Sequence, residues 1–107
     1  MDRDLEELAR VDSSVAITLE AAVSLGAMPI DRFGTPEQKA RWLPRLATGK
    51  ALGAFGLTEP AGGSDAGATR TTARLDGGEW VINGAKSFIT NSGTAITDLI
   101  TVTAVTG

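Results

Sequence analysis

The stretch GLTEPAGGSDAG, from Gly56 to Gly67, has the residue types of a loop that could bind a ligand. Small residues allow neighbouring backbone N–H groups to converge on an anion or a carbonyl oxygen. The hydroxyls of Thr58 and Ser64 can both donate and accept hydrogen bonds. The glycine spacing matches neither the Walker loop nor the GxGxxG dinucleotide loop. Composition alone favours an ordinary flexible connector over a ligand loop.

A second candidate is KSFITN, Lys86 to Asn91, whose β-branched and aromatic residues predict a strand. In a strand, Phe88 and Thr90 would share one face and Ile89 would lie on the other. An aromatic ring beside a hydroxyl could pack on a flat heterocycle and hydrogen-bond its edge. The pattern alone favours the plainer interpretation, in which Phe88 belongs to the core and Thr90 is a satisfied strand threonine.

Few residues in the sequence are suited to acid–base or metal chemistry. The chain has no cysteine and no histidine, which excludes disulfides, thiolate and imidazole metal ligands, and catalytic triads built on histidine. Glu59 could act as a general base, but a base needs a positioned substrate and a tuned pKa. A single loop carboxylate is more often a cap or a solvated charge. No catalytic residue and no metal site is therefore predicted within the chain.

The elements that would position these loops change in character along the chain. From Asp2 to Gly49 the apolar spacing predicts helices. Asp12 is a candidate N-cap, and Gly26 is predicted to end a helix. The sequence TPEQ at Thr35 predicts a capping box with proline at the first helical position.

From Ala51 onward the pattern predicts an antiparallel sheet. One hairpin is expected around Asp76-Gly77-Gly78, and a second with a type I′ turn at Asn83-Gly84. Leu99 to Val105 is expected to be another strand. Helices followed by strands predict an α+β fold, with residues 1–50 and 51–107 belonging to two different domains.

Composition limits the partners and the compartment. The 107 residues carry a net charge of −3 with scattered Lys and Arg, which does not fit a nucleic-acid-binding face. The N-terminal MDRDLEELAR has no apolar run after it and is not a signal peptide. No stretch approaches the roughly 18 apolar residues of a membrane span. A cytoplasmic protein is expected. Open strand edges at the end of the chain favour a fragment over a complete domain.

Taken together, three blocks in order resemble the acyl-CoA dehydrogenase family. They are SSVAITLEAAVSLGAMPIDRFGTPEQKARWLPRLATGK, then GAFGLTEPAGGSDAGATRTTA, then GGEWVINGAKSFITNSGTA. The second contains the G-L-T-E-x-x-G-G-S-D core of a family signature. The resemblance covers nearly the whole chain and is weak only from Met1 to Val11. The resemblance implies an α–β–α enzyme, with residues 1–50 ending the N-terminal helical domain and residues 51–107 beginning the flavin-binding β-domain.

The resemblance also implies a chemistry. Enzymes of this family hold FAD and oxidise an acyl-CoA thioester to the trans-2-enoyl-CoA, in fatty acid β-oxidation. A glutamate removes the α-proton, and the β-hydride passes to the flavin. An electron-transferring flavoprotein usually accepts the electrons, and members form homo-oligomers. Relatives with the same fold, such as acyl-CoA oxidases and flavin monooxygenases, remain alternatives, as does an inert binding or oligomerisation fragment.

Carried over by motif, thirteen positions are expected to line the flavin. Leu57 backbone groups and the Thr58 hydroxyl would bond the ring edge, Thr90 would lie near the hydride-accepting nitrogen, and Ser64 would also contact the substrate. Phe88 stands where many relatives have tryptophan, which keeps an aromatic face but loses the indole donor. The catalytic glutamate is expected beyond residue 107. The expected cofactor-binding residues are Phe55, Gly56, Leu57, Thr58, Glu59, Pro60, Ala61, Gly62, Gly63, Ser64, Phe88, Ile89 and Thr90.

Overall fold

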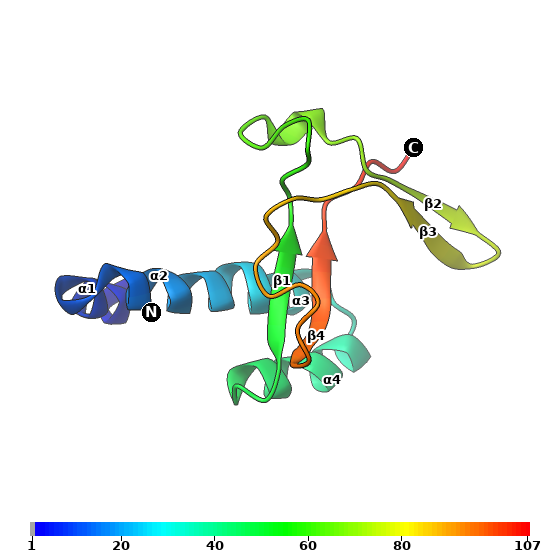
Figure 1. Ribbon diagram of the computed structural model, residues 1–107. Coiled ribbons are helices and arrows are strands. Elements are labelled where there is room, and N and C mark those ends of the chain that lie inside the picture. The colour runs from blue at the N-terminus through cyan, green and yellow to red at the C-terminus, as the bar shows by residue number, and fades with distance from the viewer. Residues whose placement is uncertain (1) are drawn as a thin grey trace.

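The computed structural model describes residues 2–107 and confirms the predicted order of helices followed by strands (Figure 1). The helices are α1 (Asp2–Val11), α2 (Ser13–Ala21), the π-helical stretch η1 (Ala22–Ala27), α3 (Met28–Phe33) and α4 (Pro36–Ala47). The strands are β1 (Leu52–Gly56), β2 (Thr72–Asp76), β3 (Glu79–Asn83) and β4 (Thr97–Val102), with a short 3-10 helix, η2 (Ala66–Ala68), before β2.

The two helix starts predicted from capping residues are confirmed. Asp12 caps α2, since its Oδ1 accepts hydrogen bonds from the N–H groups of Ser14 at 2.8 Å and Val15 at 3.3 Å. Thr35 and Gln38 form the reciprocal capping box of α4. These side chains satisfy N–H groups that a helix start leaves without partners, so the sequence fixes both boundaries.

The prediction that Gly26 ends a helix is wrong. Instead, α2, η1 and α3 form one helix from Ser13 to Phe33 that crosses β1 and β4 (Figure 1). Gly26 is buried at that crossing. A Cβ on Gly53 of β1 would lie only 3.0 Å from the Gly26 Cα. Glycine is therefore used here for the close approach of two backbones, which local sequence cannot distinguish from a helix stop.

This helix also bears on the prediction that the chain has no membrane span. It has 21 residues, and an 18-residue window within it has a mean hydropathy of 1.4, so by length and composition it could cross a membrane. The finding is weak evidence for a membrane, because core helices of soluble proteins pass the same test.

The strands form two separate pairs. The hairpin predicted around Gly77-Gly78 is confirmed: β2 and β3 are antiparallel, with Asp76 opposite Glu79 and positive φ angles at both glycines. The other pair, β1 with β4, is parallel, whereas the sequence predicted antiparallel strands throughout. It is parallel because the connection from β3 to β4, residues 84–96, returns the chain past β1 before β4 begins (Figure 1).

The second predicted hairpin and the strand predicted at Lys86 to Asn91 are both wrong. The chain leaves β3 at Asn83 and follows an irregular path from Gly84 to Ile96. Gly84 does not serve a type I′ turn; its position faces Thr71, and a Cβ there would lie 2.3 Å from the Thr71 hydroxyl oxygen. Thr97 to Val102 forms β4, so the strand predicted at Leu99 to Val105 exists but begins and ends earlier.

The packed interior of the described chain is small. Ala51 and Ala54 are buried around β1, and Ala16 is buried against α1. Many larger apolar side chains are exposed, including Leu75, Trp80, Val81 and Ile82 on the projecting hairpin. Arg45 of α4 forms an ion pair with Asp98 of β4, which ties the helical part to the sheet. Contacts between β1, β4 and η1 hold the end of β1 in place below the candidate loops.

Candidate functional site

The two candidate segments meet at the carboxyl end of β1. Thr58 lies two residues after β1, and its carbonyl oxygen accepts a hydrogen bond from the Ser87 N–H at 2.8 Å. The segment after β3 also contacts β1 itself, because the Asn91 side chain donates to the Gly53 carbonyl oxygen at 3.4 Å. The tertiary structure therefore places the loop after β1 beside the segment that follows β3, although Thr58 and Ser87 are 29 positions apart in the sequence.

The loop after β1 folds back on itself in a tight turn. The Glu59 N–H donates to the Gly62 carbonyl oxygen at 2.9 Å, and the Gly62 N–H donates back to Glu59 at 3.1 Å. Pro60 and Ala61 lie exposed at the tip of this turn. A Cβ on Gly63 would lie 3.3 Å from the Thr58 methyl group, so the absence of a side chain there allows the loop to close on Thr58.

The Glu59 carboxylate points into the protein. It is 8% exposed and accepts four hydrogen bonds: from the Thr71 N–H at 2.9 Å, the Thr71 hydroxyl at 2.7 Å, the Arg70 N–H at 2.8 Å and the Lys86 ammonium at 2.9 Å. The Lys86 hydrogen bond, followed by those from Thr71 and Arg70, lowers the pKa of Glu59 to about 2. Such a carboxylate stays ionised and is a poor base near neutral pH.

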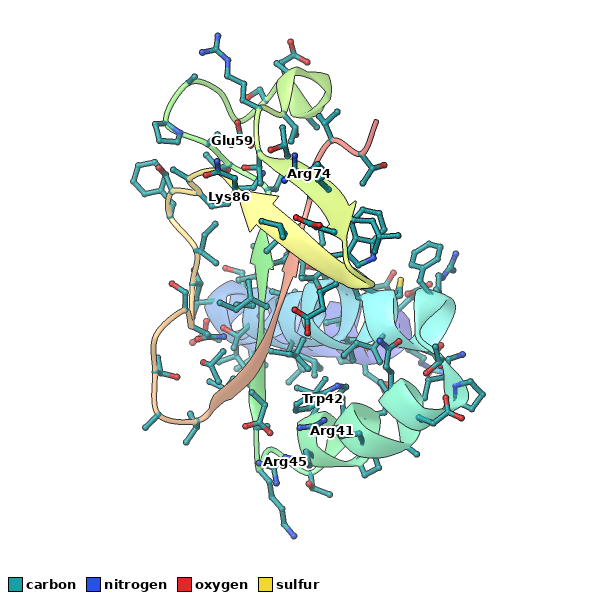
Figure 2. All side chains as sticks on the ribbon, turned by 90° about the vertical axis from the view of Figure 1, so that its right-hand side faces the viewer. Arg41, Trp42, Arg45, Glu59, Arg74 and Lys86 are labelled. Atoms are coloured by element: carbon teal, nitrogen blue, oxygen red, sulfur yellow. The ribbon has the colours of Figure 1, made fainter. Side chains whose placement is uncertain are left out.

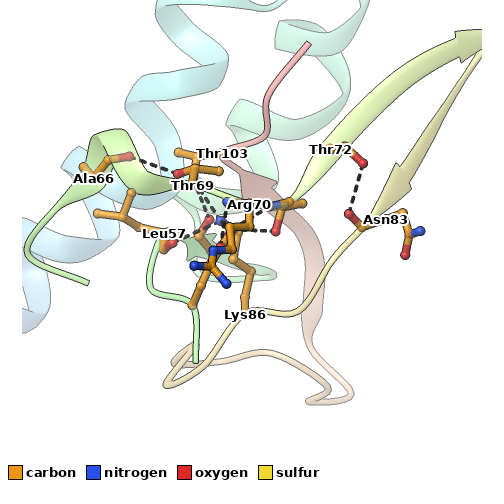
Figure 3. Close-up of polar contacts among 11 residues, drawn as sticks. Leu57, Ala66, Thr69, Arg70, Thr72, Asn83, Lys86 and Thr103 are labelled. Carbon is orange, nitrogen blue, oxygen red and sulfur yellow. Dashed lines mark hydrogen bonds and ion pairs between the residues drawn. The ribbon is translucent and has the colours of Figure 1, made fainter. Parts of the chain in front are cut away.

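Lys86 is the residue that sequence reasoning missed. Its side chain is 10% exposed, and its ammonium donates to the Leu57 carbonyl oxygen at 3.0 Å, to Glu59 at 2.9 Å and to the Thr103 hydroxyl at 3.1 Å (Figure 3). Figure 2 shows Lys86 and Glu59 side by side near the end of β1. The sequence around Lys86 does not distinguish it from an exposed lysine, because exposed lysines have similar neighbours in sequence.

Phe88 is held in an unusual conformation. Its φ is 61°, and its side chain is 94% exposed. A bulky residue with positive φ is a genuine outlier, and such residues gather at functional sites. The backbone is fixed on both sides: Ser87 donates to Thr58, and the Ile89 carbonyl oxygen accepts from Ser92 N–H at 3.2 Å and from its hydroxyl at 2.8 Å. This bend replaces the predicted strand, and it means that Phe88 is not core.

Three hydroxyls of the predicted set have no hydrogen-bond partner within residues 2–107: those of Thr58, Ser64 and Thr90. Ser64 and Thr90 are exposed, and Thr58 is half-buried. The exposed Phe88 ring belongs to the same two segments, which therefore present an aromatic face and free hydroxyl donors. These groups suit a flat, polar-edged ring, whereas the described residues show no group of carboxylates that could hold a metal ion.

Two other predicted residues, Phe55 and Gly56, belong to β1. Phe55 is half-buried in β1, and Gly56 is buried, with Lys86 so near that a Cβ on Gly56 would lie 3.3 Å from the lysine side chain. A hollow of about 330 Å³ lies elsewhere, between α3, α4 and β4. Its lining includes Phe33, Trp42 and Ile100 but none of the predicted site residues, so it is a separate apolar surface.

Two family models match the chain. Residues 5–50 match the model of the acyl-CoA dehydrogenase N-terminal domain, and residues 54–107 match that of the middle domain. A probable acyl-CoA dehydrogenase, YngJ of Bacillus subtilis, is 54% identical over 96% of this chain and 27% of its own length.

Two solved structures share the fold. A glutaryl-CoA dehydrogenase from Mycobacterium smegmatis is 40% identical, with a TM-score of 0.83 over 95% of this chain and 26% of its own. An acyl-CoA dehydrogenase from Bacillus anthracis, complexed with FAD, is 47% identical, with a TM-score of 0.77 over 95% of this chain and 18% of its own. The chain thus spans about a quarter of the length of the curated relatives that it matches.

Proposed function

Because the chain belongs to the acyl-CoA dehydrogenase family, we propose that it is the central part of a longer FAD-dependent enzyme that oxidises an acyl-CoA thioester. In this proposal residues 1–50 end a helical domain and residues 51–107 begin the flavin-binding domain. The exposed apolar side chains of the long helix and of the hairpin support it, since a large exposed apolar surface usually faces a partner or another part of the protein.

The observation that carries the proposal is the meeting of the two loops at the end of β1. Residues 57–64 and 86–90 come together there, joined by the Ser87–Thr58 hydrogen bond and by Lys86. The exposed Phe88 ring and the unpartnered Thr58 and Thr90 hydroxyls fit a flavin, which offers a flat ring with hydrogen-bonding edges. The FAD complex of the relative from Bacillus anthracis supports the same assignment.

When bound, FAD supplies the hydride-accepting chemistry. The residues of this chain would bind and orient it: Phe88 gives an apolar face, and Thr58 and Thr90 give hydroxyl donors. Gly62, where a Cβ would meet nothing within 4 Å, lets the backbone come close. Ser64, exposed on the same loop, is proposed to contact the phosphate-bearing part of the flavin or of the substrate.

Glu59 does not serve as the base in this proposal. Four hydrogen bonds and a pKa lowered to about 2 keep its carboxylate occupied and weakly basic. The α-proton would therefore pass to a carboxylate contributed by another part of the complete protein. We further propose a cytoplasmic, homo-oligomeric enzyme that passes its electrons to an electron-transferring flavoprotein, on the strength of the family membership alone.

The test is FAD binding by the complete protein that contains this chain. We expect a yellow protein and a marked change in flavin fluorescence on titration. Phe88→Ala should weaken FAD binding by about tenfold, the loss of one aromatic contact. Phe33→Ala removes another exposed aromatic, on α3, and should leave FAD binding unchanged. A colourless protein that does not take up added FAD would overturn the proposal.

The reaction is tested separately with an acyl-CoA substrate under anaerobic conditions. Bleaching of the flavin is expected on mixing. Turnover should then be faster with an artificial electron acceptor than with oxygen alone. Faster turnover with oxygen would instead favour the acyl-CoA oxidase alternative.

A further inference from the structure

The ammonium of Lys86 lies where three segments of the chain meet. It donates to the loop after β1 through the Leu57 carbonyl oxygen and the Glu59 carboxylate, and to the chain after β4 through the Thr103 hydroxyl. These three acceptors use all three ammonium donors. Since the side chain is 10% exposed, solvent screens these contacts little, and a buried ammonium is tolerated because it is paired and fully hydrogen-bonded.

One of these contacts acts on the backbone of the candidate site. The Leu57 carbonyl and the Thr58 N–H belong to the same peptide unit, which is trans. In a trans peptide the C=O and the N–H point in opposite directions. The Leu57 carbonyl is directed to Lys86 at 3.0 Å, so the Thr58 N–H is directed away from it.

That N–H is free to bind something else. Within residues 2–107, the Thr58 N–H donates to no backbone or side-chain acceptor. Hydrogen bonds in a chain polarise one another, and a charged donor on the carbonyl strengthens the effect. The Lys86 ammonium therefore makes the Thr58 N–H a stronger donor than an ordinary backbone amide, on the loop that also carries the unpartnered Thr58 hydroxyl.

Glu59 keeps this arrangement electrically balanced. It pairs with Lys86 at 2.9 Å and is itself held by Thr71 and Arg70. The pair thus fixes the loop after β1 to the segment 84–91 while placing no net charge in the interior. Its geometry is suited to positioning, because both side chains are almost buried, at 10% and 7% exposed.

We propose that Lys86 is a positioning residue of the flavin site, which orients and polarises the Leu57–Thr58 peptide so that the Thr58 N–H binds the flavin more tightly when the flavin is reduced. This inference rests on the proposed function. Its physical reason is that reduction adds electron density to the flavin ring, and a strengthened donor interacts more favourably with the more electron-rich form.

The test is the midpoint potential of FAD bound to the complete protein. Lys86→Met alone leaves Glu59 unpaired in the interior and can prevent folding, so the main variant is Glu59→Gln with Lys86→Met, which removes both charges. We expect this variant to bind oxidised FAD. The ratio of its affinity for reduced flavin to its affinity for oxidised flavin should fall about tenfold. For a two-electron couple, that loss lowers the midpoint potential by about 30 mV. Lys50→Met, an exposed lysine, is the control and should leave the potential unchanged.

A second measurement needs no flavin. The amide proton of Thr58 should shift upfield in the NMR spectrum of the FAD-free double variant, because its peptide is less polarised. A double variant that binds FAD with an unchanged potential, or that leaves the Thr58 amide shift unchanged, overturns the role of Lys86 while the proposed function stands. A wild-type protein that binds no flavin overturns both.

Discussion

Gly53 of β1 and Gly26 of the long helix are in backbone contact. A Cβ on Gly53 would lie 3.0 Å from the Gly26 Cα and 3.3 Å from its carbonyl oxygen. A Cβ on Gly26 would meet the Gly53 Cα only at 3.8 Å, an ordinary contact. The crossing of the helix over the strand therefore depends more on the absence of a side chain at Gly53 than at Gly26.

This asymmetry gives a stability prediction. Gly53→Ala should lower the free energy of unfolding by about 1–3 kcal/mol, since the clash is with backbone atoms that have no room to move. Gly26→Ala should be neutral or stabilising by up to about 1 kcal/mol, because alanine is the better helix former. Chemical denaturation of the FAD-free protein compares the two variants. Equal destabilisation by both would contradict the asymmetric contact.

Gly84 gives a second prediction, connected with the site. A Cβ there would lie 2.3 Å from the Thr71 hydroxyl oxygen and 2.7 Å from the Thr71 Cα. Gly84→Ala should therefore displace Thr71 from Glu59 and destabilise the protein by about 1–3 kcal/mol. Gly67→Ala is the control, because its Cβ would meet only the Asp65 carboxylate at 3.4 Å. If unfolding curves of the two variants coincide, Thr71 does not lie against Gly84.

The pH dependence of stability should reveal the Glu59 carboxylate. Its pKa is lowered from 4.5 to about 2 in the folded protein, so its stabilising contribution is complete above pH 4.5 and is lost as the pH falls toward 2. Glu59→Gln should have a lower melting temperature than wild type at pH 7 and pH 5. The difference in melting temperature between the variant and the wild type should decrease steadily below pH 4.5. A difference that stays constant down to pH 3 would show that Glu59 has an ordinary pKa.

Phe88 should show opposite effects on stability and on binding. Its φ of 61° is unfavourable for any residue with a Cβ. Phe88→Gly should therefore raise the unfolding free energy of the FAD-free protein by up to about 1 kcal/mol, after the entropy of glycine in the unfolded chain is counted. Phe88→Ala keeps a Cβ at this unfavourable φ, so it should change the free energy of unfolding by less than about 0.5 kcal/mol. Both variants should bind FAD more weakly, as measured by flavin fluorescence. A loss of stability in Phe88→Gly would show that the ring packs within the protein.

The sequence by itself determined the features that depend on near neighbours. The N-caps at Asp12 and Thr35 and the hairpin at Gly77-Gly78 follow from a few adjacent residues, and all are confirmed. The family was also within reach of the sequence, because its signature is a run of consecutive residues. Local hydrogen bonds and turn geometry act over a few positions, so they can be read without knowing the rest of the fold.

Only the tertiary structure decided what distant segments do to each other. Gly26 is predicted to end a helix and Gly84 to form a hairpin turn, yet Gly26 lies inside a helix against Gly53, and Gly84 leaves room for Thr71. Lys86 looks like a surface lysine in the sequence, but its ammonium is buried against Leu57, Glu59 and Thr103. The strand predicted at Lys86 to Asn91 fails for the same reason. Intrinsic strand preference is weak, and the contacts of Ser87 and Lys86 with the loop after β1 outweigh it.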